Sequence, residues 1–180
     1  MTDTDKPKPK GTPRATARAL ARLGAVQALY QMDIASTPFD DVMDEFLECR
    51  LGRSEEGERL GEADFRHFKD VVEGVIREQR DLDSQIAEGL TLGWTFPRLD
   101  ATLRAVLRAG VYELRRCKDV PARVVINEYV ELAHGFFGEE EPRVVNGVLD
   151  RLAKQLRAAE FDPENRSDKP QKRALFYVRF

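Results

Sequence analysis

The sequence predicts an all-α protein of about seven helices, for three reasons. Apolar residues recur every three or four positions through most of the chain, which is the spacing of one face of an α-helix. No segment before the last few residues alternates apolar and polar residues with the period of two that is typical of a half-buried strand. Of the 180 residues, 42% are hydrophobic and 34% are charged, which suits helices with charged outer faces around one core. We expect a single domain in which the helices pack as a bundle.

The first half of the chain is expected to contain an arm and four helices. Residues 1–11 have no hydrophobic residue after the first, so we predict a disordered basic arm. Thr12 and Pro13 have the residue types of an N-cap and a first helical position. A polar stretch with three glycines, 52–61, is predicted to be a loop. The apolar stripes of the four helices lie at 20–34, 42–47, 65–76 and 82–90.

The second half is expected to contain three further helices and a tail. The stripe at 99–114 is apolar along nearly a whole side, which is typical of a central helix. The other two stripes lie at 125–133 and 145–156. We therefore place a single helical domain at 12–160. Residues 161–180 form a C-terminal extension that ends in the apolar, strand-like segment ALFYVRF, which we expect to dock on the domain because an exposed apolar edge promotes aggregation.

Composition excludes several classes of protein. The longest run without an acidic or basic residue is ten residues, 23–32, and a membrane span needs about twenty apolar residues. The N-terminal segment has no apolar core of the kind found in secretory signals. Cys49 and Cys117 are the two cysteines, and two distant cysteines do not make a disulfide framework. We expect a cytoplasmic protein.

The sequence contains no signature of a catalytic or nucleotide-binding site. GxGxxG, Walker, GxSxG and HExxH patterns are all absent. His67 and His134 lie far apart in sequence without a second histidine or a cysteine at ligand spacing, so solvated or structural roles are expected. Carboxylates come in runs such as 139–141, which is typical of a solvated helix start. We therefore expect a protein that is not an enzyme and uses no metal or cofactor.

The charge distribution indicates a binding function at the N-terminal end. Residues 1–22 hold six basic residues against two acids, whereas residues 40–64 hold ten acids against three basic residues. Arg14, Arg18 and Arg22 follow each other at spacings of four, which places them in one sector of the first helix. No acid lies between Lys6 and Arg22, so no neighbour on the helix neutralises them.

We interpret the three arginines as a solvent-facing basic ridge that grips phosphates, because guanidinium groups bind phosphate bidentately. Leu29 falls on the arginine side of the helix and is expected to be exposed there. Tyr30, two turns after Arg22, has two open interpretations. Its ring can stack on an unpaired RNA base, or it can pack in the core with the rest of the apolar stripe.

Three segments carry a resemblance to a known family. They are AVQALY at 25–30, the set VLR, YEL and DVP within 106–121, and the set INE and VNGVLD within 126–150. In order and spacing these segments resemble the NusB family of bacterial transcription antitermination factors. The resemblance implies an all-helical fold of two subbundles and binding of the single-stranded boxA RNA element. It also implies a heterodimer with the small-subunit ribosomal protein NusE, within RNA polymerase complexes that suppress premature termination on ribosomal RNA operons.

The resemblance assigns roles to particular residues. The RNA-binding residues it implies are Arg14, Arg18, Arg22, Tyr30, Arg143 and Asn146. The residues that we assign to the protein partner are Leu103, Arg104, Arg108 and Glu139. The chain departs from the family at Val144, where the family has phenylalanine, so base stacking at that position is not supported. Phe136 and Phe137, one loop earlier, are the alternative.

Several alternatives stay open. Arg108 and Glu113 can instead pair within the central helix or across helices. The whole chain can instead be a helical protein-interaction module, or a homodimer that touches RNA only incidentally. NusB-like domains also occur in ribosomal RNA methyltransferases, but this sequence lacks the glycine-rich loop of a methyl-donor domain.

Overall fold

The structure is a computed structural model that describes residues 14–53, 57, 59–91 and 93–162. In this part of the chain there are seven α-helices and no named strand, so the predicted all-α fold is confirmed. The helices are α1 (Arg14–Ala35), α2 (Phe39–Glu45), α3 (Phe65–Gly89), α4 (Ala101–Arg116), α5 (Ala122–Phe136), α6 (Glu140–Leu156) and α7 (Ala158–Phe161). A π-helical turn, η1 (Phe46–Arg50), extends α2, and a 3-10 turn, η2 (Phe96–Arg98), precedes α4. The predicted arm, 1–11, and all but the first two residues of the extension, 161–180, lie outside the described residues.

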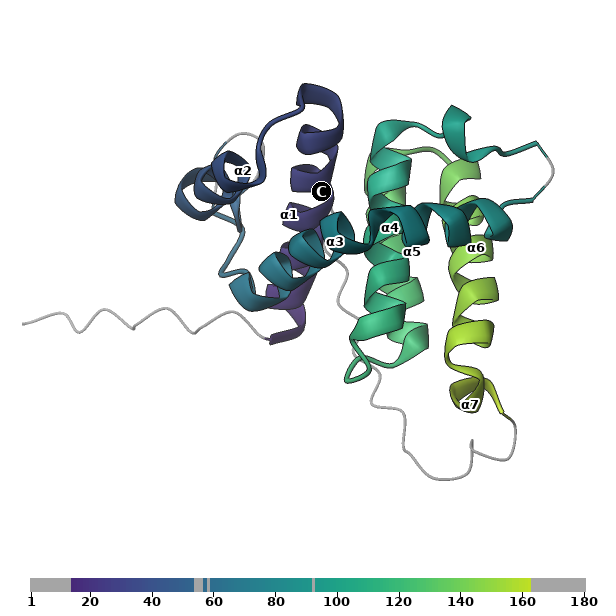
Figure 1. Cartoon of the computed structure of the whole chain (residues 1–180). Coiled ribbons are helices and arrows are strands. Elements are labelled where there is room, and N and C mark those ends of the chain that lie inside the picture. The colour runs from purple at the N-terminus through teal and green to yellow at the C-terminus, as the bar shows by residue number, and fades with distance from the viewer. Residues whose placement is uncertain (1–13, 54–56, 58, 92, 163–180) are drawn as a thin grey trace, which may run out of the picture.

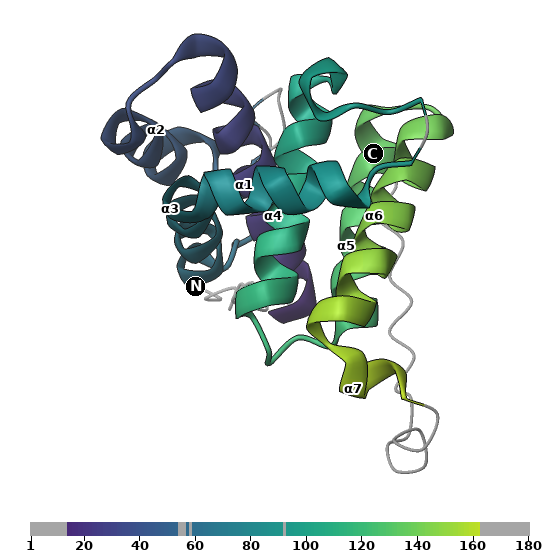
Figure 2. The same ribbon diagram turned by 45° about the vertical axis from the view of Figure 1, so that its right-hand side comes forward.

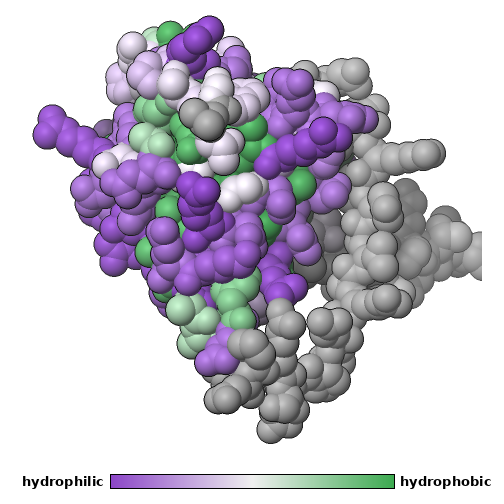
Figure 3. Space-filling model, turned by 90° about the vertical axis from the view of Figure 1, so that its right-hand side faces the viewer, coloured by the Kyte–Doolittle hydropathy of each residue, from purple (hydrophilic) through white to green (hydrophobic). Residues whose placement is uncertain are grey.

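The helices form two subbundles that meet at α4. In Figure 1, α1 and α2 lie on the left and α5, α6 and α7 on the right, while α3 starts beside α1 and crosses α4 towards α6. Helix α4 packs against α1 and α3 and against α5 and α6. This arrangement confirms the prediction that the apolar stripe at 99–114 belongs to a central helix. Seen from the α6 side, the surface is mostly hydrophilic and carries an apolar patch (Figure 3).

One difference from the sequence prediction concerns α3. Residues 65–76 and 82–90 were predicted to be two helices, but they belong to one helix of 25 residues. The break in the apolar stripe is caused by Glu78, which occupies a buried position on the core-facing side. Its carboxylate lies 2.8 Å from Arg116 Nε and 3.5 Å from Arg115 Nη2 of α4. A salt-bridged acid therefore takes the place that an apolar residue would take.

Helix α3 crosses α4 at close range, as the view in Figure 2 shows. The approach depends on Gly74, because a Cβ atom at this position would overlap the ring of Tyr112. The two ends of α4 are also fixed by side chains. At the start, Asp100 Oδ1 accepts a hydrogen bond from the backbone N–H of Thr102 at 2.8 Å. At the end, the buried Arg157 donates to the backbone carbonyls of Glu113, Leu114 and Cys117 and so ties the last turn of the helix to the end of α6.

A buried ion pair joins the two subbundles. Arg22 of α1 donates two hydrogen bonds to Glu113 of α4, from Nη2 at 2.6 Å and from Nε at 3.0 Å. The exposed fractions of the two side chains are 3% and 0%. Tyr129 Oη of α5 donates to the same carboxylate at 2.9 Å, and His67 Nε2 of α3 lies 3.3 Å from it. Arg22 Nη1 also donates to Glu128 of α5 at 3.1 Å. Four helices thus converge on one carboxylate.

The surroundings of Glu113 determine its charge. Burial alone raises the pKa of this carboxyl, but the interactions with His67 and with the Arg22 guanidinium outweigh burial and lower the pKa from 4.5 to about 2. Burial and the adjacent Glu113 carboxylate raise the pKa of the Tyr129 hydroxyl, so this group stays protonated and remains a donor. The Glu113 carboxylate is therefore charged at neutral pH and accepts hydrogen bonds from Arg22 and Tyr129.

The depressed pKa of Glu113 makes the stability of the fold dependent on pH. The carboxylate stabilises the folded state fully above its unfolded pKa of 4.5, and this contribution is lost as the pH falls from about 5 to about 2. The shift corresponds to about 3 kcal/mol of unfolding free energy. Glu113→Gln should therefore flatten the pH dependence of unfolding in urea over this range. Glu131→Gln, an exposed change on α5, is the matched control, and an equally steep dependence in both variants would contradict this account.

Candidate nucleic-acid interface

The predicted arginine ridge does not face solvent without partners. Arg22 is buried in the ion pair with Glu113, so the expectation that its guanidinium is exposed and unpaired is wrong. Arg18 is largely buried, with Nη1 3.0 Å from Asp119 and Nε 3.6 Å from Asp64. The hydrogen bond from Arg18 lowers the pKa of Asp119, which keeps this carboxylate charged. The side chain of Arg14 lies outside the described residues.

The physical reason is that the carboxylate partners are remote in sequence. Glu113 and Glu128 lie 91 and 106 residues from Arg22, so the absence of acids on the first helix gave no indication of them. Helix α1 is packed against α2, α3 and α4, and both of its sides meet other helices. For the same reason Leu29, which we expected to be exposed beside the arginines, is buried.

The C-terminal half of α1 is more exposed than its apolar stripe predicts. Ile34 was expected in the core but has 59% of its surface exposed, and Tyr30 has 40%. Of the two interpretations of Tyr30, full burial in the core is therefore excluded. The aromatic ring is accessible at the point where α1 passes the end of α5.

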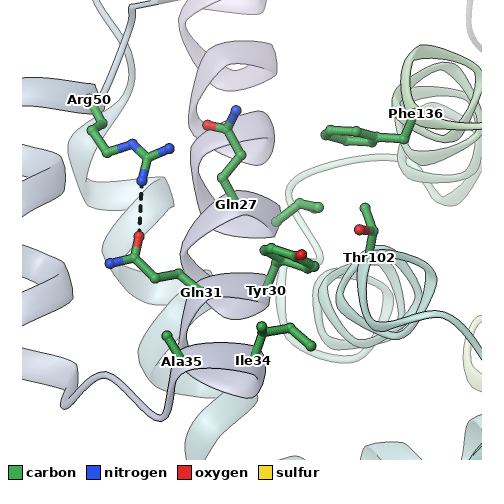
Figure 4. Close-up of a pocket in the computed structure, with 9 residues that line it drawn as sticks. Gln27, Tyr30, Gln31, Ile34, Ala35, Arg50, Thr102 and Phe136 are labelled. Carbon is green, nitrogen blue, oxygen red and sulfur yellow. Dashed lines mark hydrogen bonds between the residues drawn. The ribbon is translucent and has the colours of Figure 1, made fainter. Parts of the chain in front are cut away.

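Tyr30 and Ile34 line a groove of about 550 Å³, which we call the Tyr30 groove. Its lining residues are Val26, Gln27, Tyr30, Gln31, Ile34, Ala35, Arg50, Thr102 and Phe136. Figure 4 shows that Tyr30 from α1 and Phe136 from the end of α5 project toward the same space. Phe136 has 38% of its surface exposed. Two accessible aromatic rings thus face one groove, from elements more than a hundred residues apart.

The polar side chains Arg50 and Gln31 lie on the side of the Tyr30 groove away from Phe136 (Figure 4). Arg50 Nη1 donates to Gln31 Oε1 at 3.0 Å and to Glu45 at 3.2 Å, and Gln31 Nε2 donates to Glu45 at 2.7 Å. The Gln31 hydrogen bond, together with Arg50, lowers the pKa of Glu45. Gln27 lies on the same helix face as Tyr30, one turn earlier (Figure 4). Aromatic rings beside amide groups can stack on bases and bond their edges.

Arg143 and Asn146 lie near the start of α6 and are exposed. Arg143 Nη2 is 3.3 Å from Glu139, but both side chains are highly exposed, and a surface pair of this kind contributes little. Residues 137–139 connect α5 to α6, so this pair of residues follows Phe136 closely along the chain. The arrangement leaves the Arg143 guanidinium accessible to an anion.

Val144, at the position where the family has phenylalanine, shares a cavity with an aromatic residue from elsewhere in the chain. Val144 and Trp94 both line a cavity of about 380 Å³ between the end of α3 and α6, together with Arg143. Trp94, which comes from the connection between α3 and α4, was not among the candidate site residues. Its half-buried ring lines the same cavity as Val144. The two residues are far apart in sequence, so no local pattern indicated that they share a cavity.

The predicted partner-binding residues do not form one exposed surface. Leu103 is fully buried, and Arg108 is buried with Nε 2.7 Å from Asp83, so the assignment of these two residues to an accessible docking surface is wrong. The pairing of Arg108 across helices confirms the alternative for this residue. Arg104 is partly exposed, with Nη2 2.9 Å from Asp33, and Glu139 is exposed. These last two stay accessible to a partner.

The described part of the chain offers few candidates for a metal site or a reactive cysteine. No group of three His, Cys, Asp or Glu residues there comes together to hold a metal ion. Cys49 is exposed, while burial raises the pKa of the Cys117 thiol to about 12, which keeps it unreactive. None of the described helices is long and apolar enough to cross a membrane.

Comparison with known proteins places this geometry in a family. The sequence matches the NusB family over residues 19–154. It is 51% identical over 157 residues to the transcription antitermination protein NusB of Rhodopseudomonas palustris strain BisB18, covering 87% of this chain and 93% of that protein. It is 52% identical over 148 residues to the protein of the same name from Nitrobacter hamburgensis, covering 82% and 92%.

Solved structures agree with the sequence comparison. T. maritima NusB superposes with a TM-score of 0.67 at 27% identity, covering 84% of this chain and 99% of that one. A complex of the antitermination factors NusB and NusE with double-stranded RNA contains a chain that matches with a TM-score of 0.60 at 26% identity, covering 78% and 98%. In sequence and in fold, the chain belongs to the NusB family.

Proposed function

We propose that this protein is an RNA-binding transcription antitermination factor that acts by binding and not by catalysis. It binds boxA-type single-stranded RNA together with a NusE-type small-subunit ribosomal protein, and so supports transcription of ribosomal RNA in the cytoplasm. The relatives named as antitermination proteins support the process, and the solved complex of NusB, NusE and RNA supports the two partners.

The observation that carries the proposal is the pair of accessible rings in the Tyr30 groove. Tyr30 and Phe136 project into one space from α1 and α5, and neither ring is needed to fill the core. Stacking of a base on an aromatic side chain contributes about 1–3 kcal/mol. A single strand can present its bases to such rings, whereas a duplex buries them in its own stack. The groove therefore suits unpaired RNA.

The phosphate contacts come from residues that are accessible. Arg143 and Asn146 on α6 are exposed, and the basic residues of the N-terminal arm together with Arg14 add positive charge. Arg22 is excluded, because removing its guanidinium from Glu113 would leave a buried carboxylate without its partner at a cost of about 3–5 kcal/mol. Its role is to hold α1 in place. Arg18 keeps a small accessible surface beside Asp119.

The protein partner binds next to the RNA in this proposal. Arg104 pairs with Asp33 of α1, which directly precedes Ile34 of the Tyr30 groove, and Glu139 lies three residues after Phe136. Both residues are accessible and flank the groove. A partner that contacts them would border the bound RNA and add its own contacts, so we expect the strand to bind more tightly in its presence.

A second candidate is a homodimer in which RNA contact is incidental. Ile34, with 59% of its surface exposed beside Tyr30, favours a protein partner at the groove over RNA alone. Light scattering with and without RNA separates the two. A dimer that persists with RNA bound would favour the interaction module, whereas a monomer that takes up RNA favours the antitermination factor.

Fluorescence anisotropy tests the proposed function directly. A labelled boxA-like RNA should bind more tightly than a scrambled strand of equal length, and addition of the NusE-type protein should increase the difference. Specific recognition by base contacts, unlike phosphate contacts, depends on the order of bases. Equal affinity for the two strands with no effect of the partner protein would overturn the proposal.

Substitutions in the groove test the assigned residues. Tyr30→Ala and Phe136→Ala should each weaken binding of boxA-type RNA by roughly 5- to 150-fold, the equivalent of about 1–3 kcal/mol of lost stacking. The melting temperature should change little, since both rings are substantially exposed. Ile76→Ala, an exposed apolar change on α3, is the matched control and should leave the affinity unchanged. Full affinity in both aromatic variants would remove the groove from the RNA site.

A further inference from the structure

The apolar wall of the Tyr30 groove is larger than RNA binding explains. Ile34 is the most exposed of the large apolar residues in the described part of the chain, and it projects beside Tyr30 (Figure 4). Leu47 is also half-exposed and lies on η1, the element that supplies Arg50 of the groove, although Leu47 does not line the groove itself. Isoleucine and leucine offer no flat ring to a base, and an exposed patch of this kind in a protein usually marks a site that another apolar segment covers.

The charge beside the groove opposes a polyanion on one side. Glu45 does not line the groove, but it bonds Gln31 and Arg50, which do. The other carboxylates of α2 and η1 are exposed, namely Asp40, Asp41, Asp44 and Glu48. A single arginine stands against these five acids within the two elements. This side of the groove repels phosphate and attracts a segment that is apolar and basic.

The chain itself contains a segment of that composition. Residues 174–180, ALFYVRF, are apolar apart from one arginine, and Lys172 and Arg173 precede them. We propose that residues 174–180 dock in the Tyr30 groove of the same molecule, with their apolar side chains against Tyr30, Ile34 and Phe136 and the flanking basic residues toward the acids of α2 and η1. Docking occludes the rings, and, given the proposed function, the segment competes with RNA.

The distances allow this occupant. Glu160 of α7 accepts a hydrogen bond from the backbone N–H of Ala122 at 2.7 Å, so the described chain ends beside the start of α5. Phe136 lies fourteen residues further along α5, which is about 21 Å at the helical rise. A coil as long as residues 163–173 spans about 20 Å on average and at most about 36 Å. A linker whose mean length matches the separation gives the highest effective concentration of the tethered segment.

The chain offers a natural position for a reporter. Cys49 is exposed and adjoins Arg50 of the groove wall, and the other cysteine, Cys117, is buried. A nitroxide attached to Cys49 of the full chain broadens the NMR signals of nearby nuclei. With docking, the amide signals of residues 174–180 should lose most of their intensity relative to the reduced, diamagnetic sample. Undiminished signals from these residues would overturn the proposal.

Two variants and a mixing control define the contact. Ile34→Glu, at a highly exposed position, should restore the signals without loss of stability, and the double change Phe176→Ser with Tyr177→Ser should do the same from the other side. Arg80→Glu, an exposed charge change on α3, should leave the broadening intact. Broadening in a mixture of tagged, unlabelled protein with untagged, isotope-labelled protein would mean that the segment binds a second copy, which overturns docking within one molecule.

A separate measurement of RNA affinity tests whether the docked segment competes with RNA. Stopping the chain after Asp162 should tighten binding of boxA-type RNA by about three- to tenfold, because the groove is no longer partly occupied. Addition of RNA to the tagged full chain should restore the signals of residues 174–180. Equal RNA affinity of the full and shortened chains would overturn the competition. Failure of both chains to bind RNA would contradict the proposed function, while the broadening experiment would still decide whether the segment docks.

Discussion

The ion pair between Arg22 and Glu113 is the interaction on which the rest of the structure depends. It joins α1 to α4, and through Tyr129 and Glu128 it reaches α5, so it sets how the two subbundles meet. Taking two charges out of water costs several kcal/mol per ion, and the cost is offset only when hydrogen bonds satisfy both groups. The position of α1 in turn decides which residues of that helix reach the surface.

Most of the fold could be predicted from the sequence. The apolar spacing indicated α1, α2, α4, α5 and α6, and the uniform apolar side of 99–114 indicated the central helix. Prediction was wrong for α3, where Glu78 interrupts the apolar stripe without interrupting the helix. A buried acid with arginine partners on another helix is indistinguishable in sequence from a solvated one. Periodicity records which side of a helix is apolar and does not record how its polar positions are paired.

The candidate site was harder to predict for the same reason. The arginine spacing was real, but its interpretation assumed that carboxylate partners would be near in sequence, and the partners of Arg22 are about a hundred residues away. Conversely, Ile34 has the spacing of a core residue and lies where α1 extends beyond its neighbours. The groove between Tyr30 and Phe136 needs the ends of two helices to meet, and no local pattern reports that. The family resemblance, by contrast, singled out Tyr30 without any geometry, and the structure shows that this residue lines the groove.

The central claim is that RNA bases enter the Tyr30 groove while Arg22 stays bound in the core. Photo-crosslinking tests it most directly: boxA-type RNA that carries 5-bromouridine is irradiated on the full chain with the NusE-type protein, and the adducts are located by mass spectrometry. The account predicts adducts on the peptides that contain Tyr30 and Phe136. Adducts confined to other surfaces, such as the outer side of α3, with none at these two residues would contradict it.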